Sequence, residues 1–194
     1  QSQIVLTARS GHAALKHRLE ELGYDPIPVY TEPETPLGNP ELAKEYPLRL
    51  TTSGRISPLY HSEMRTPGHG TRSVVPWPMT WMHINDARKL HIREGDWIWI
   101  ENQRGRITQK AHLDSGIGEN VVNAQFGWWY PEAGAPDYGW RESNVNLLTA
   151  AAPPYDRYLG SYQLRALLCR VYPTPEGRAI KERYGTWMNE KSEH

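Results

Sequence analysis

The stretch that most restricts the fold is Trp97–Asn102, which reads WIWIEN and alternates bulky apolar side chains between two faces. Such alternation is typical of a β-strand, because successive side chains point to opposite sides. The run starts directly after a turn, REGD, and a second turn, QRG, leads into the strand-like RITQKAHL. It predicts two strands joined by a hairpin. We expect the isoleucines to face the core and Trp97 and Trp99 to lie under a neighbouring domain.

A short helix is predicted just before this strand, over the letters DARKL, with Asn85 or Asp86 as its cap. Glycine is the most favourable residue where such a helix ends, because it adopts a left-handed conformation without strain. This chain has His91 there, and histidine tolerates that conformation less well than glycine. We therefore expect a tolerated strain at His91.

Prolines and glycines, 16 of each, divide the remaining chain into short pieces. Further strands are predicted at LRLTTSG, NVVNAQFG and LRALLCRVYP, and a short amphipathic helix at SGHAALKHRLEELG. Prolines are too dense for a helix over residues 25–47, which predicts an extended strap. Residues 56–80 are predicted to be irregular, and loops of this length are usually functional or ordered by a partner.

These elements predict a small, mostly β barrel with short peripheral helices. Its organisation is an N-terminal helix and proline-rich strap over 1–46, a barrel over 47–173 and a helical tail over 174–194. Lys plus Arg equals Asp plus Glu at 22 each, so bulk charge gives no reason to expect nucleic-acid binding. No apolar run approaches the length of a membrane helix, so no membrane insertion is expected.

Conventional catalytic and metal-binding patterns are absent from the sequence. The single cysteine, Cys169, excludes an internal disulfide or a cysteine-cluster metal site, and its apolar neighbours predict a buried thiol. The eight histidines show no metal-ligand spacing, and serines and carboxylates show no catalytic spacing. We therefore expect neither a metal ligand nor a self-sufficient active site.

Three short stretches carry side chains that suit a ligand. TTSGR offers hydroxyls, backbone N–H groups and Arg55 to a phosphate or heterocycle. GWWYPE puts adjacent indoles on opposite sides, one for the core and one for a ligand, although two packing tryptophans explain it equally well. ESNVNLLT puts Asn144 and Asn146 on one face if the segment is extended, where amides can read a pterin or purine edge. A pair of turn asparagines is an equal alternative.

Taken in order, seven motifs resemble the C-terminal part of the catalytic subunit in the dimethyl sulfoxide reductase superfamily, the molybdenum or tungsten bis-pterin oxidoreductases. They are LEELGYDPIPVYTEP, PELAKEYPLRLTTSGR, YHSEMRTPG, HINDARKLHIREGDWIWIENQRGRI, FGWWYPE, ESNVNLLT and GSYQLRALLCRVYP. The combination is most similar to the branch that contains acetylene hydratase and pyrogallol transhydroxylase. The family usually has glycine where this chain has His91, and residues 64–81 are only loosely similar.

The resemblance implies a six-stranded double-psi β-barrel, of the aspartate decarboxylase-like class, that closes over the pterin dinucleotides. The implied cofactor is bis-molybdopterin guanine dinucleotide, with molybdenum or tungsten held through the pterin dithiolenes. Carried over motif by motif, the cofactor-binding residues are Thr52, Ser53, Gly54, Arg55, His61, Trp128, Asn144, Asn146, Gln163 and Arg165.

The resemblance also implies partners. In the family the metal ligand and any iron-sulfur cysteines lie in other domains of the catalytic subunit, encoded upstream or in a separate chain, and an iron-sulfur subunit is a further candidate. The isolated chain is therefore not expected to be catalytic. A bacterial or archaeal cytoplasm or periplasm is the expected location. Two alternatives remain: a self-contained enzyme on the same barrel, and a protein-interaction module that uses the Trp and Tyr surface.

Overall fold

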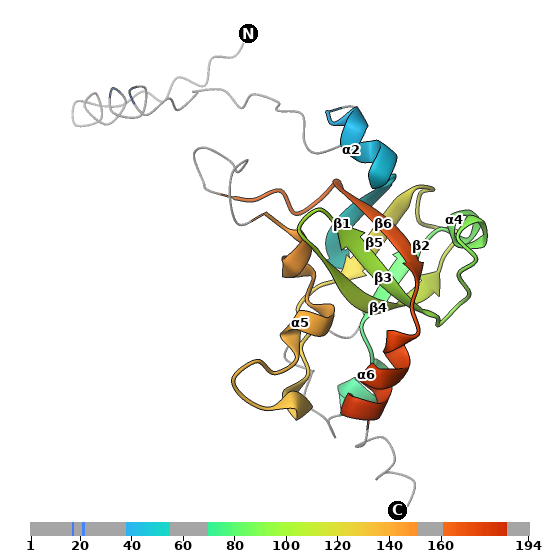
Figure 1. The fold of residues 1–194 in the computed structure, drawn as a ribbon, viewed down its shortest axis with the longest axis vertical. Helices are drawn as coiled ribbons and strands as arrows, with labels where there is room; N and C mark the ends of the chain where they lie inside the picture. Colours follow the sequence, from blue (N-terminus) through green and yellow to red (C-terminus); the bar gives the residue numbers. More distant parts are fainter. Residues whose placement is uncertain (1–16, 18–20, 22–37, 55–69, 151–160, 186–194) are drawn as a thin grey trace, which may run out of the picture.

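The computed structural model describes residues 17, 21, 38–54, 70–150 and 161–185. At its centre is a closed barrel of six strands. The strands are β1 (Leu48–Gly54), β2 (Met79–Met82), β3 (Trp97–Asn102), β4 (Gly105–Leu113), β5 (Val121–Gln125) and β6 (Leu167–Pro173). Short helices surround it: α2 (Pro40–Glu45), α3 (Gly70–Val74), α4 (Ile84–Lys89), α5 (Trp140–Ser143) and α6 (Glu176–Tyr184), with 3-10 turns η1 (Pro131–Ala133) and η2 (Val145–Leu148). In Figure 1, α4 and α5 flank the barrel on opposite sides and α6 lies below it.

The strand order shows that the two halves of the barrel are interlocked. Around the barrel the strands follow β1-β5-β2-β4-β3-β6. The pairs β1/β5 and β2/β4 are parallel, and the other four are antiparallel. Exchanging β1, β2 and β3 with β4, β5 and β6 leaves this set of pairs unchanged, so the halves are related by a pseudo-two-fold axis. The predicted fold, a mostly β six-stranded double-psi barrel, is confirmed.

Aliphatic side chains fill the inside of the barrel. Ile98 and Ile100 are fully buried there, as the alternation in WIWIEN predicted. The indoles on the other face of β3 are largely covered by this chain itself. The ring of Trp97 meets Trp77 edge to face at 5.7 Å, and the guanidinium of Arg106 lies 4.3 Å above the ring of Trp99. The expectation of a neighbouring domain over these indoles is therefore wrong for Trp99, which is only 9% exposed.

A second hydrophobic cluster joins the C-terminal helix α6 to the segment after β5. Its buried members are Val75, Trp77, Trp128, Tyr130, Ile180 and Tyr184. The rings of Tyr130 and Tyr184 stack at 4.3 Å. The fully buried Arg72 lies over Trp128 and forms an ion pair with Glu132 at 3.0 Å. Burial lowers the pKa of the Arg72 guanidinium, and the Glu132 carboxylate opposes that shift.

Three local predictions need correction. The segment 56–80 was predicted to be irregular, yet it contains α3 and β2 in its described part. Within the predicted extended strap, residues 40–45 form α2, because the Asn39 side chain caps the helix and Pro40 occupies the first turn, where proline is tolerated. The cap of α4 is His83, whose Nδ1 accepts from the Asn85 backbone N–H at 3.0 Å. The predicted N-terminal helix lies outside the described residues, apart from positions 17 and 21.

His91 has the left-handed backbone that the sequence predicted, with φ of 56°. Its side chain is exposed, so replacing it removes no core contact. A left-handed conformation costs a non-glycine residue roughly 1–2 kcal/mol of folding free energy. Glycine avoids this cost, but it loses more conformational entropy on folding, which offsets part of the gain. His91→Gly should therefore raise the free energy of unfolding by about 1 kcal/mol, measured by urea denaturation. His91→Val should lower it, and stabilisation by valine would contradict the explanation.

Candidate functional site

One end of the barrel collects most of the residues that the sequence predicted for binding. Strands β1, β3 and β5 finish at this end, and β2, β4 and β6 begin there, as their pairing directions require. At this end the turn 161–166 contacts the last residues of β1, and η2 contacts the hairpin 102–105. We call this region the barrel mouth.

The end of β1 is fixed to the turn before β6. The backbone N–H and the hydroxyl of Thr52 both donate to the Leu164 carbonyl oxygen, at 3.2 and 2.7 Å. The hydroxyls of Thr51 and Ser53 lie 3.0 Å apart. Thr52 and Leu164 are separated by 112 residues in the chain. The structure thus brings the predicted residues of the first strand beside those of the last turn.

The turn itself is held by a glutamine side chain. The Gln163 Nε2 donates to the carbonyl oxygens of Arg165 and Ala166, at 3.0 and 3.1 Å, and Ala166 has a left-handed φ of 57°. Arg165 is exposed, and so are the two apolar side chains of the turn, Tyr162 and Leu164, at 42% and 50%. The turn therefore offers one cation and two apolar surfaces at the barrel mouth.

Gly54 is required by the close approach of two other strands. A Cβ atom at this position would lie 2.9 Å from the Ala124 carbonyl carbon and oxygen, and 2.9 Å from the Trp81 ring. Backbone atoms cannot move aside as a flexible side chain can, so any side chain here would separate β1 from β5. The packing of β1 against β5 and β2 therefore explains why position 54 is a glycine.

The two predicted asparagines have different environments. Asn144 precedes η2, and its Oδ1 accepts from the backbone N–H of Asn146 at 3.0 Å. Val145 and Leu148 are buried in the barrel core, and Asn146 is exposed. The segment is thus a capped 3-10 turn instead of the extended strand that the prediction of one shared face assumed. Asn146 is therefore exposed at the mouth, while Asn144 is only partly exposed and its Oδ1 is engaged in the cap.

A buried glutamine, which the sequence interpretation missed, links the barrel interior to this segment. The Gln109 Oε1 accepts from the Thr80 hydroxyl at 2.7 Å and from the Gln125 N–H at 3.2 Å. Its Nε2 donates to the carbonyl oxygens of Gln125 and Ser143, at 2.9 and 3.1 Å. Ser143 comes directly before Asn144. The signal was a glutamine between the inward-facing Ile107 and Ala111.

Trp128 does not join this group, and the places of two further predicted residues are not described. Arg55 and His61 lie outside the described residues. Trp128 is fully buried in the second cluster, and its Nε1 donates to Gln125 Oε1 at 2.5 Å. Its ring has no surface open to a ligand in this structure. The half-buried member of the indole pair is Trp129, which packs edge to face on Tyr138 at 6.0 Å. The predicted cofactor contacts of Arg55, His61 and Trp128 remain predictions.

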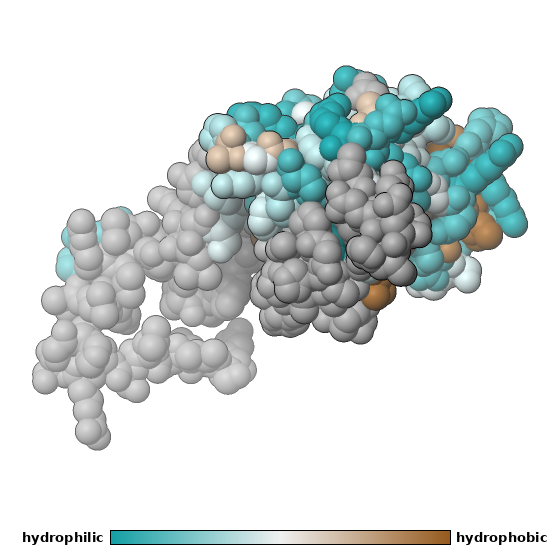
Figure 2. Space-filling model, turned by 90° about the horizontal axis from the view of Figure 1, so that it is seen from below, coloured by the Kyte–Doolittle hydropathy of each residue, from teal (hydrophilic) through white to brown (hydrophobic). Residues whose placement is uncertain are grey.

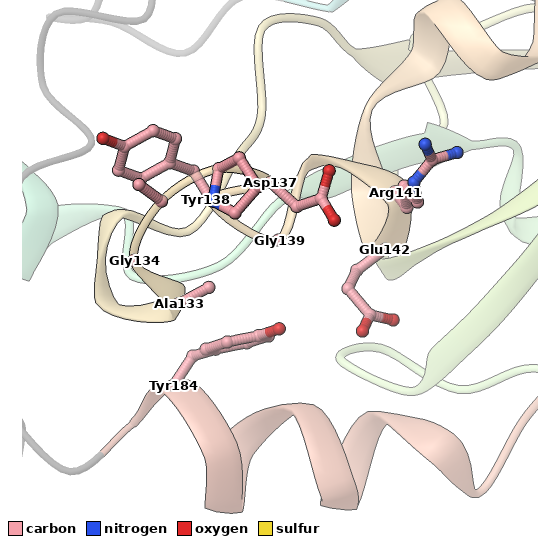
Figure 3. Close-up of a pocket in the computed structure, with 10 residues that line it drawn as sticks. Ala133, Gly134, Asp137, Tyr138, Gly139, Arg141, Glu142 and Tyr184 are labelled. Carbon is pink, nitrogen blue, oxygen red and sulfur yellow. The ribbon is translucent and has the colours of Figure 1, made fainter.

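A separate pocket of about 330 Å³ lies between the loop 133–139 and Tyr184 of α6. Figure 3 shows the carboxylates of Asp137 and Glu142 and the hydroxyl of Tyr184 around its opening. Glu142 is already paired with Arg183 at 2.5 Å. None of the residues predicted for binding lines this pocket. We therefore place the candidate site at the barrel mouth.

The barrel mouth offers hydroxyls, amides, backbone groups and an arginine. In the described part of the chain, no group of three or more His, Cys, Asp or Glu side chains could hold a metal ion. Cys169 is buried as predicted, and burial raises the pKa of its thiol. No described helix is long and apolar enough to cross a membrane. Seen from below, the described surface is mostly hydrophilic with small hydrophobic patches (Figure 2). The hydroxyls, amides, backbone groups and arginine of the barrel mouth suit phosphate groups and heterocycle edges.

Comparison with known proteins gives consistent matches. Residues 48–166 match the family model described as "Molydopterin dinucleotide binding domain". Dopamine dehydroxylase of Eggerthella lenta is 38% identical over 151 residues, which are 77% of this chain and 15% of that protein. Acetylene hydratase of Syntrophotalea acetylenica is 38% identical over 122 residues, 62% of this chain and 17% of that protein.

A solved structure agrees with these sequence matches. Acetylene hydratase from Pelobacter acetylenicus superposes with a TM-score of 0.73 at 32% identity, covering 80% of this chain and 22% of that chain. The chain therefore spans less than a quarter of the length of these relatives.

Proposed function

Because the chain belongs to the molybdopterin dinucleotide binding domain family, we propose that it closes over bis-molybdopterin guanine dinucleotide within a larger molybdenum or tungsten oxidoreductase. The observation that carries this proposal is the barrel mouth. There, the turn before β6 contacts the end of β1, and η2 contacts the β3–β4 hairpin, although these segments are far apart in the chain. The family resemblance inferred from seven motifs is confirmed.

The residues of the barrel mouth fit such a dinucleotide. The hydroxyl of Ser53, the backbone of the turn and the Arg165 guanidinium are suited to phosphate oxygens. The exposed Asn146 amide has a donor and an acceptor for a pterin or purine edge. Gly54 leaves the end of β1 without a side chain. When bound, the cofactor supplies the dithiolene sulfurs that hold the metal. This chain binds and orients the dinucleotide, and Tyr162 and Leu164 exclude water from its edge.

The relatives support a place within a longer catalytic subunit. Dopamine dehydroxylase and acetylene hydratase contain a region like this chain as 15–22% of their length. We propose that the remaining domains form the second wall of the cofactor cleft and carry the metal ligand, and that an iron-sulfur subunit is a further partner. The reaction and substrate belong to that complete subunit.

Asn146→Ala tests the dinucleotide contact. In the complete subunit this substitution should lower the affinity for the dinucleotide by about fivefold to tenfold, because one hydrogen bond of roughly 1 kcal/mol is lost. The measurement is the nucleotide released per polypeptide on denaturation, by mass spectrometry. Asn85→Ala is the matched control, since Asn85 makes one side-chain hydrogen bond to Glu119 at the opposite end of the barrel. Full nucleotide content in Asn146→Ala would remove Asn146 from the site.

A second measurement tests the larger assembly. The isolated chain should bind the dinucleotide at least tenfold more weakly than the complete subunit, because one wall of the cleft is missing. Isothermal titration of both proteins with the same dinucleotide gives the comparison. Equal affinity would favour the alternative of a self-contained protein on this barrel.

A further inference from the structure

Asn102 joins the β3–β4 hairpin to η2 through its side-chain amide. It is the last residue of β3 and only 3% exposed. Its Nδ2 donates to the Leu148 carbonyl oxygen at 2.8 Å, and its Oδ1 accepts from the Arg104 N–H at 2.9 Å. One amide group thus holds the hairpin turn and the last residue of η2 together.

Besides the burial of Val145 and Leu148 in the core, side-chain hydrogen bonds hold η2 on both sides. At its start, Ser143 accepts from Gln109 through its carbonyl, and its hydroxyl donates to the Thr108 carbonyl oxygen at 2.7 Å. At its end, the Asn102 amide holds Leu148. The hairpin also lies beside η2, since a Cβ at Gly105 would make an ordinary contact, 3.6 Å from the Leu147 carbonyl oxygen. The exposed Asn146 lies between these two attachments.

We propose that Asn102 is a positioning residue for dinucleotide binding: it fixes the end of η2, and so the place of Asn146, without touching the dinucleotide. This inference rests on the proposed function of the barrel mouth. The Asn102 side chain has little freedom to move. Its Cα belongs to β3, and its side-chain oxygen already accepts from the Arg104 N–H. Losing the donor therefore loosens the end of η2, while Val145 and Leu148 remain in the core, and it removes no ligand contact.

Asn102→Asp separates the two hydrogen bonds. The carboxylate keeps the acceptor for the Arg104 N–H, but it faces the Leu148 carbonyl oxygen with another acceptor. In the complete subunit, the amount of nucleotide retained per polypeptide should fall about tenfold. This is the loss expected when one hydrogen bond is replaced by repulsion between a carboxylate and a carbonyl oxygen. Amide hydrogen exchange over residues 145–149 should accelerate at least tenfold, while exchange in β2 and β5 stays unchanged.

Ile98→Val is the control for lost stability alone. It removes one core methylene on the same strand, which costs about 0.5–1.5 kcal/mol, and it leaves both hydrogen bonds of the Asn102 side chain in place. It should keep its nucleotide and its exchange pattern over 145–149. A second variant, Asn102→Ser, retains a donor and should lose less nucleotide than Asn102→Asp.

The outcomes separate the two proposals. If Asn146→Ala loses nucleotide but Asn102→Asp retains it, or loses no more than Ile98→Val, the positioning role is wrong and the site stands. If Asn146→Ala and Asn102→Asp both retain nucleotide although exchange over 145–149 accelerates, the proposed dinucleotide site itself is wrong. Both proposals are supported if only Asn146→Ala and Asn102→Asp lose nucleotide and if amide exchange in Asn102→Asp accelerates only over residues 145–149.

Discussion

Replacing Gln109 with leucine should lower the free energy of unfolding by about 3–5 kcal/mol, although the two side chains have similar size. The reason is that four partners lose their hydrogen bonds at once inside a closed barrel. They are the Thr80 hydroxyl, the N–H and carbonyl of Gln125 and the Ser143 carbonyl. A buried polar group left without a partner carries its full desolvation cost, so the loss exceeds the net value of the bonds themselves.

Urea denaturation followed by tryptophan fluorescence measures this effect. Thr80→Val is the matched control, since it removes one hydroxyl from the same network and leaves the glutamine its other three bonds. We expect it to cost about 1 kcal/mol. If Gln109→Leu cost no more than Thr80→Val, the glutamine would not organise the barrel interior. Because Gln109 also holds Ser143, amide exchange over residues 143–149 should accelerate in Gln109→Leu before the rest of the barrel unfolds.

Gly54→Ala should have the largest combined effect on the site and on stability. The new Cβ would stand 2.9 Å from the Ala124 backbone, so β1 must move away from β5. Overpacking of this kind costs about 1–3 kcal/mol. The same movement shifts Thr52 from the Leu164 carbonyl oxygen and opens the barrel mouth. In the complete subunit we expect dinucleotide affinity to fall by more than tenfold, a larger loss than for any single contact residue.

Gly118→Ala provides the comparison for this prediction. A Cβ at Gly118 would make an ordinary contact, 3.6 Å from a Val121 methyl group, at the opposite end of the barrel. Its effects on stability and on nucleotide content should be small. Thermal unfolding of the chain and the nucleotide content of the complete subunit are the two readouts. A Gly54→Ala protein with normal nucleotide content would show that the end of β1 does not shape the site.

What the sequence could predict of the fold depended on how local each signal was. Strand β3 and the hairpin to β4 were predictable, because alternation and turn residues lie side by side in the chain. Strand β2 was not. Its four residues follow two prolines, and its partners are β4 and β5, which lie about 30 to 45 residues further along. Pairing over that distance leaves no pattern in a window of four residues.

The candidate site was predictable as a set of motifs but not as a geometry. Thr52 in β1 and Gln163 in the turn before β6 were named from the resemblance, and the contact between the two segments exists only because β1 pairs with β6. Asn144 was expected on an extended face, but its side chain caps η2 instead, which is a local alternative that asparagine often takes. Asn102 was hidden because a polar residue before a hairpin turn is usual on the surface, whereas here η2 covers it.

The interlocked strand order has a consequence for synthesis of the protein on the ribosome. Leu48 in β1 pairs with Cys169 in β6, and Arg49 pairs with Val121 in β5. The first strand therefore has no hydrogen-bonding partner until the last strands have emerged, and β1–β3 cannot form a stable unit beforehand. Chains with such long-range pairing fold slowly and expose strands while they wait. We expect nascent chains that end before β6 to depend on chaperones and to remain sensitive to proteases.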